Sequence, residues 1–189
     1  VVVLDPVGRV LVVDESGGGR LLAEDPRLAL ARGLTVAPDG TVVVAATQDG
    51  ALFEVTDSGT VLALPLTAPL GQPVDTLVLA DGALAVTDAE PSSLRIFNGA
   101  EKGWSTALPP APTPTGPHLA RHGRRIFVTH PELGHVSEYA PNGSHVATYR
   151  FRTDDGRPTQ PVGVAVTADG TIVVADLAGG QVLSHSLVG

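Results

Sequence analysis

The sequence predicts an all-β protein, specifically a β-propeller built from about five four-stranded antiparallel blades. A strand–turn–strand string recurs along the 189 residues: "GLTVAPDGTVVVAA" (33–46) and "GVAVTADGTIVVAD" (163–176) are identical at eight of fourteen positions. Gly and Pro, with 22 and 16 residues, are spread throughout the chain and disfavour long helices. A repeat of about 40 residues that holds four strands is typical of a propeller blade.

Five copies of the repeat align on one turn glycine each. These glycines are Gly8, Gly40, Gly82, Gly123 and Gly170. An apolar strand enters each turn, the glycine supplies the positive φ, and a strand rich in Val, Ile and Thr follows. The repeats cover approximately residues 1–30, 31–70, 71–112, 113–158 and 159–189. We expect one domain, either a propeller or a stretch of a six-bladed propeller.

The remaining strands of each blade follow in order. Third strands are predicted at "GRLLAE", "GALFEV", "SLRIFN", "GHVSEY" and "GQVLSHS". Fourth strands are predicted in "VTDSGTVLAL" and "YAPNGSHVATY", through S-G and N-G turns, and less clearly around Trp104, which we expect to pack between blades. The tract "LPPAPTPTGP" (108–117) predicts a stiff, extended connection between the third and fourth repeats.

The first repeat begins within a strand, and the last stops after its third strand. Two interpretations fit this pattern. The chain is either a piece of a larger propeller, or its first four residues share one closing blade with its tail. We favour the first, and an unclosed stack would expose a flat apolar edge.

Composition excludes several classes of function. A net charge of −8 and a pI near 5.0 argue against a nucleic-acid partner, and the short basic run "RHGRR" (121–125) is expected to be a solvated turn. The absence of cysteine excludes disulfides, thiol catalysis and Cys-ligated zinc. No run of 18 apolar residues occurs, so no membrane span is expected within this chain.

Blade geometry divides the loops between two rims. The D-G turns lie on one rim, whereas the segments that enter the first strands and the ends of the second strands surround the channel mouth on the other. The polar residues expected at this mouth are Arg32, Gln72, Asp75, His118, Gln160, Asp14, Gln48, Asp88, His130, Glu132 and Asp176. They suit a ligand or cation site, but the recurring Asp residues also suit acceptors for backbone N–H groups in tight turns. We favour the structural role for the Asp residues, because a binding site is usually asymmetric.

The segment "THPELGH" is the one asymmetric feature of the mouth. It places His130, Glu132 and His135 within six residues, and with His118 they suit a divalent metal such as Mg²⁺ or Ca²⁺, or an acid–base pair. The spacing differs from the zinc-helix motif, because the segment begins with Pro and is not expected to be helical. A solvated polar turn is the alternative that we favour.

The string "PVGVAVTADGTIVVAD" (161–176) resembles the NHL-type propeller repeat, P-x-G-V-A-V-x-x-D-G-x-I-x-V-A-D. The second repeat departs from it at Arg32 and Ala46, where Pro and Asp are usual. The resemblance covers nearly the whole chain and implies a propeller similar to regucalcin-type lactonases, streptogramin lyases and bacterial extracytoplasmic sensor domains. The chain lacks the W-F-T-E strand ending of streptogramin lyases. Asn98 and Asn142, the only candidates for the Asn that regucalcin-type sites use, are expected in turns.

We therefore expect a non-catalytic propeller that serves as a binding, sensing or protein-interaction module of a larger protein. It would need no cofactor and would bind a protein or a small molecule at the channel mouth. The resemblance favours an extracytoplasmic or secreted location. The alternative is a metal-assisted lyase or hydrolase with a divalent cation and a site formed by His118, His130, Glu132 and His135.

Overall fold

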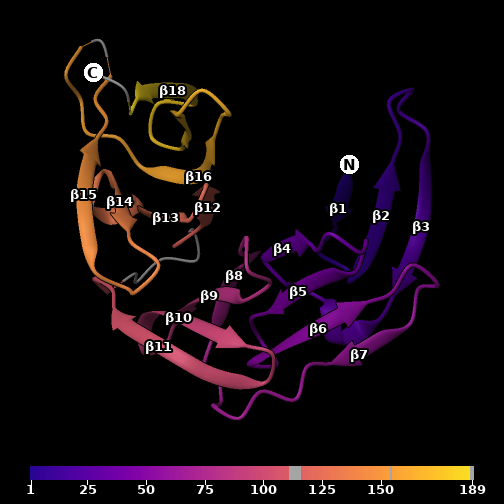
Figure 1. Ribbon diagram of the computed structural model, residues 1–189. Helices are drawn as coiled ribbons and strands as arrows, with labels where there is room; N and C mark the ends of the chain where they lie inside the picture. Colours follow the sequence, from indigo (N-terminus) through magenta and orange to yellow (C-terminus); the bar gives the residue numbers. More distant parts are fainter. Residues whose placement is uncertain (111–115, 154, 188–189) are drawn as a thin grey trace.

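The computed structural model describes residues 1–110, 116–153 and 155–187. Five antiparallel sheets, the blades, follow one another along the chain and stand side by side in an open arc (Figure 1). The first blade, in indigo, and the last, in yellow, form the two ends of this arc. The predicted all-β propeller with five blades is confirmed.

Blade 1 consists of β1 (Val2–Leu4), β2 (Arg9–Val13) and β3 (Gly19–Glu24), and blade 2 of β4 (Gly33–Val36), β5 (Val42–Ala46), β6 (Ala51–Val55) and β7 (Val61–Ala63). Blade 3 consists of β8 (Pro73–Val78), β9 (Leu84–Ala89), β10 (Ser92–Asn98) and β11 (Glu101–Ala107). Blade 4 consists of β12 (Leu119–His122), β13 (Arg125–His130), β14 (His135–Tyr139) and β15 (His145–Arg150). Blade 5 consists of β16 (Pro161–Val166), β17 (Thr171–Asp176) and β18 (Gln181–Ser186).

These strands match the sequence expectation for third strands in every blade and for fourth strands in blades 2, 3 and 4. The alternative interpretation, in which the two ends of the chain share one closing blade, is wrong. Strand β1 pairs with β2 through Val2 and Val12, whereas β18 pairs with β17, so the two ends lie in different sheets. The physical reason is local: each hairpin pairs with its sequence neighbour across a tight turn.

Two short segments form single turns of 3₁₀ helix, η1 (Pro26–Leu28) and η2 (Pro131–Leu133). Asp25 caps η1, because its carboxylate accepts a hydrogen bond from the Arg27 backbone N–H at 2.9 Å. The expectation that the segment after His130 is not helical is thus wrong for one turn. Pro131 occupies the first position of that turn, where the missing N–H of proline has no cost.

The second strand of each inner blade is buried on both faces. In β5, Val42, Val44 and Ala46 pack with blade 1, whereas Val43 and Ala45 pack with blade 3. All five are buried, which explains why this strand is a continuous apolar run and does not alternate with polar residues. Equivalent clusters fill the interfaces between blades 3 and 4 and between blades 4 and 5.

Polar contacts between blades accompany this packing. The Thr87 hydroxyl on β9 donates to the Pro117 carbonyl of blade 4 at 2.7 Å and accepts from the Asp75 N–H at 3.1 Å. The Trp104 indole N–H donates to the Pro141 carbonyl of blade 4 at 2.8 Å. Trp104 also packs against the apolar cluster of blades 3 and 4, so its predicted place between blades is confirmed.

Half of the Pro-rich tract at 108–117, residues 111–115, lies outside the described residues. Its first residue, Leu108, is buried in the cluster between blades 3 and 4. No helix in the described part of the chain is both long and apolar enough to cross a membrane.

Thr87→Val tests the contact between blades 3 and 4. Thr87 is fully buried, so the change leaves the Pro117 carbonyl and the Asp75 N–H without their partner and out of reach of water. We expect a loss of about 2 kcal/mol or more in the free energy of unfolding, measured by urea denaturation. Thr106→Val on the outer strand β11 is the control and should change stability by less than about 0.5 kcal/mol. An equal effect of both variants would contradict the role given to Thr87.

Candidate functional site

The first strands of the blades lie next to one another, β4 beside β8 and β8 beside β12. Asp75 lies on β8 of blade 3, and His118 directly precedes β12 of blade 4. The structure brings the two side chains together, with His118 Nδ1 at 3.2 Å from Asp75 Oδ2. Of the residues expected at the channel mouth, these two form a side-chain pair across two blades.

Backbone hydrogen bonds hold the Asp75 carboxylate in place. Its Oδ2 accepts from the Leu119 N–H at 2.8 Å, and its Oδ1 accepts from the Thr76 N–H at 2.8 Å. The His118 N–H donates to the Thr129 hydroxyl at 2.8 Å, which fixes the other partner. Asp75 is only 8% exposed, whereas a quarter of the His118 side chain is accessible.

This geometry determines which ring nitrogen of His118 is left to contact a ligand. An ionised carboxylate only accepts hydrogen bonds, so Nδ1 of His118 carries the hydrogen that points to Asp75. In the neutral ring Nε2 is then the basic nitrogen. A partly exposed imidazole oriented by a buried carboxylate can bind a hydrogen-bond donor or accept a proton.

A comparison of equivalent positions shows that the pair is asymmetric. Gly33, Asp75 and Gly163 pair with Ala45, Thr87 and Ala175 on the second strands of their blades. Each of the three stands seven residues before the turn glycine of its repeat. Asp75, at a position where the other two blades have Gly, was therefore the feature of the sequence that could have indicated this site. Gly33 also packs directly on Asp75, since a Cβ at Gly33 would lie 2.2 Å from Asp75 Oδ1.

The recurring Asp residues at the ends of the second strands serve as backbone acceptors. Asp88 is fully buried and accepts from the N–H groups of Gly71 at 2.9 Å and Gln72 at 2.7 Å. Its carboxylate also lies 3.1 Å from the guanidinium of Arg95. Asp14 does the same in an exposed turn, where it accepts from the Gly18 N–H at 2.9 Å. These contacts are the ones expected for a structural role of the recurring carboxylates.

Asp176 repeats this role in blade 5. It accepts from the Gln160 N–H at 2.7 Å and the Gly179 N–H at 3.0 Å, and it is 2% exposed. Burial by itself would raise the pKa of Asp176, but the hydrogen bonds from Gln160, Gln181 and Gly179 outweigh it and hold the pKa below its usual value. The Asp176 carboxylate is therefore ionised, and these hydrogen bonds occupy its oxygen atoms.

Four other polar residues expected at the mouth lie at the surface or line a hollow. Arg32, Gln48 and Gln72 are exposed. The Gln72 side chain donates to Glu90 at 3.1 Å. Gln160 lines a hollow of about 310 Å³ between blades 4 and 5, together with Glu132, Arg150 and Arg152.

The His-Glu-His segment separates into different environments. His130 is buried and its ring packs on that of His135, with the centroids 4.8 Å apart, whereas Glu132 is exposed. Among the residues that the structure describes, Nε2 of His130 has no hydrogen-bond partner. Burial, with a smaller repulsion from His135 and His145, lowers the pKa of His130 to about 4. Within the described ranges, no group of three or more His, Cys, Asp or Glu side chains is arranged to hold a metal ion.

Comparison with solved structures supports the same fold. A streptogramin B lyase superposes with a TM-score of 0.65 at 13% identity, over 97% of this chain and 63% of that chain. A catalytically inactive virginiamycin B lyase from Staphylococcus aureus, solved with quinupristin, gives 0.72 at 13% identity over 100% and 69%. A gluconolactonase from Xanthomonas campestris gives 0.71 at 20% identity over 98% and 71%. The chain thus has the fold of NHL- and regucalcin-like β-propellers, and it spans less than two thirds of the first of these proteins.

No protein-family model and no curated protein sequence matches the chain. The similarity is therefore one of fold, at identities too low to transfer an activity.

Asp176→Ala tests the structural role of the recurring carboxylate. The change leaves the N–H groups of Gln160 and Gly179 without the buried carboxylate that accepts from them. We expect a loss of about 2 kcal/mol in the free energy of unfolding by urea denaturation. Asp14→Ala is the matched control, because Asp14 has the same role in an exposed turn where water can replace it, and we expect it to cost about 1 kcal/mol or less. If the two variants lost the same stability, burial would not be the reason.

The lowered pKa of buried His130 predicts that the folded protein loses stability in acid. The pKa of His130 falls from an ordinary 6.5 to about 4 on folding. Between these two pH values His130 therefore binds a proton in the unfolded chain but not in the folded chain. This contribution to stability is fully present above about pH 6.5 and is lost as the pH falls toward 4, by up to about 3 kcal/mol.

Urea denaturation of the wild type and of His130→Leu between pH 7 and pH 4 measures this effect. The variant should lose less stability over that range than the wild type, because the buried titrating group is gone. His122→Gln, at the end of strand β12, is the control and should follow the wild type. Parallel pH profiles of the wild type and His130→Leu would rule out the assignment.

Proposed function

We propose that the chain is an NHL-like propeller module that binds a small molecule or a protein segment at the rim where the first strands begin, without catalysing a reaction. One observation carries the proposal: the recurring rim carboxylates, Asp14, Asp88 and Asp176, are committed to backbone N–H groups. What remains for a ligand is the asymmetric pair of Asp75 and His118 and the hollow beside Gln160. An asymmetric polar pair on a rigid, repetitive scaffold suits recognition.

A second candidate is an enzyme that uses His118 as an acid–base group. The observation that favours it is the orientation of the imidazole by Asp75, which leaves Nε2 as a base. The solved structures with this fold include lyases and a gluconolactonase. In this candidate His118 would act with or without a divalent cation such as Mg²⁺ or Ca²⁺, whereas buried His130 would not contact substrate.

Turnover assays separate the two candidates. The chain is incubated with glucono-δ-lactone and with quinupristin, each with and without Mg²⁺ or Ca²⁺, and ring opening is followed against buffer. The binding module predicts rates equal to buffer for the wild type and for His118→Ala. A rate above buffer that falls at least about tenfold in His118→Ala, with the melting temperature unchanged, would establish the enzyme instead.

Ligand binding is tested by a thermal-shift screen of small metabolites and peptides. A true rim ligand raises the melting temperature of the wild type, and this shift should disappear in His118→Gln. Arg32→Ala, an exposed rim change outside the Asp75–His118 pair, is the control and should keep it. Shifts that survive His118→Gln would place the ligand elsewhere.

We also propose that the chain works within a larger protein, in keeping with an extracytoplasmic or secreted setting. The support is the apolar surface at both ends of the arc. Leu21 in blade 1 is 51% exposed and Val182 in blade 5 is 71% exposed, whereas the same faces of the inner blades are buried against neighbours. Such faces are normally covered in a functioning protein.

A further inference from the structure

We propose that a hollow between blades 3 and 4 binds a small amphipathic carboxylate, a molecule with an apolar body and one anionic group. The hollow opens at the D-G turns, on the rim opposite to Asp75 and His118. It is therefore a separate site, and the proposal does not depend on the function proposed above.

The hollow has a volume of about 440 Å³, which is within the range of small-molecule sites. Blade 3 forms most of its wall, through the β8–β9 turn and the ends of β10 and β11. Blade 4 closes it with the β12–β13 turn and with Pro141 from the β14–β15 turn.

The inner wall is apolar and firmly held. It consists of Leu79, Ala83, Ile96 and the ring of Trp104, all of which belong to the apolar cluster between blades 3 and 4. Trp104 is anchored by its hydrogen bond to Pro141 and packs against Gly143, where a Cβ would lie 2.7 Å from the indole ring. The tryptophan thus forms a fixed wall and does not fill the space itself, so an apolar body can lie against it.

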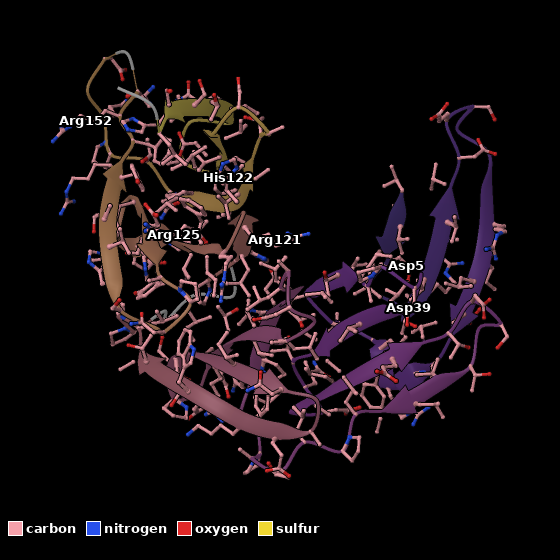
Figure 2. The ribbon with its side chains drawn as sticks, in the orientation of Figure 1. Asp5, Asp39, Arg121, His122, Arg125 and Arg152 are labelled. Carbon is pink, nitrogen blue, oxygen red and sulfur yellow. The ribbon has the colours of Figure 1, made fainter. Side chains whose placement is uncertain are left out.

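A cation stands at the mouth of this apolar space. Arg124, in the β12–β13 turn, lines the hollow and is exposed, and none of the ion pairs among the described residues includes it. Its neighbour Arg125 differs, because it pairs with Glu138 at 2.7 Å. Figure 2 labels Arg121, His122 and Arg125 on blade 4, on the two strands that the turn with Arg124 connects. A free guanidinium suits a carboxylate, which it can bind through two parallel hydrogen bonds.

Asp81 also lines the hollow but is already engaged. Its Oδ1 accepts a hydrogen bond from the Ala83 N–H at 3.2 Å within the β8–β9 turn. Asn98 supplies the remaining polar side chain of the wall, an amide that can donate to a ligand oxygen.

The equivalent position between blades 2 and 3 provides an internal comparison. A hollow of about 430 Å³ lies there at the same rim, and its charged lining residues are Asp39 and Glu54. The space itself therefore comes from the blade architecture, since it recurs. Each hollow includes the Asp of its D-G turn, Asp81 or Asp39, which accepts a backbone N–H. The second charged residue differs, because it is Arg124 in one hollow and Glu54 in the other, and the aromatic wall belongs to the hollow between blades 3 and 4. This difference selects an anion for one hollow and disfavours it in the other.

Trp104 is the only tryptophan of the chain, so its fluorescence reports directly on this hollow. The probes are octanoate, the neutral octanamide and the cationic octylammonium, titrated into the whole chain below their micelle concentrations. We expect a saturable change in Trp104 emission with octanoate and at least tenfold weaker binding of the other two. Equal binding of all three probes, or no saturable change with octanoate, would overturn the proposal.

Arg124→Ala provides the decisive comparison. It should weaken octanoate binding at least tenfold and leave the binding of octanamide unchanged, because only the anion uses the guanidinium. Arg121→Ala removes the same charge from strand β12, next to this turn, at a residue that does not line the hollow, and it should weaken octanoate binding less than twofold. Equal losses in both variants would mean that the anion senses only the general charge of blade 4, which would refute the site. Circular dichroism confirms that each variant is folded.

Discussion

The burial of the second strand of each inner blade between two neighbouring sheets is the constraint on which the rest of this structure depends. In β5, alternate residues pack with blade 1 and blade 3, so a strand that is apolar throughout is satisfied only inside a stack. The stack places the first strands side by side, which brings Asp75 of blade 3 within hydrogen-bond distance of His118 of blade 4. At the opposite rim it leaves hollows between successive turns.

The repeat also determines which polar residues are available for function. A carboxylate at the end of a second strand holds the loop that enters the first strand of its own blade, as Asp88 and Asp176 do. Buried and bonded to backbone N–H groups, these side chains have little capacity left for a ligand. Recognition is consequently expected where the repeats differ. Asp75 stands at a position where two other blades have glycine, and Arg124 lines a hollow whose counterpart is lined by acidic residues.

The two rims offer different chemistry. At the rim of Asp75 and His118, a buried carboxylate orients a partly exposed imidazole, which suits a hydrogen-bonding ligand or a proton transfer. At the rim of the D-G turns there is a fixed aromatic wall and the guanidinium of Arg124, which forms no ion pair with another described residue, and together they suit an amphipathic anion. His130 and His135 belong to neither of these sites. They are buried against each other, and burial keeps His130 neutral at physiological pH.

The sequence by itself determined the blades, because a turn glycine and an apolar strand recur in each repeat. Strands that are neighbours in the sequence pair across these turns, so the position of each strand in its blade follows from the order of the chain. It also indicated that the repeated Asp residues are structural, since their recurrence matches the turns and not a single site. Only the tertiary structure decided which residues of different repeats meet. His118 lies 43 residues from Asp75, and Trp104 lies 37 residues from Pro141. Spacing within one repeat contains no information on such pairs, because they depend on how the blades stack. For the same reason the grouping of His118 with His130 and His135 was only a hypothesis, and the structure places them in separate pairs.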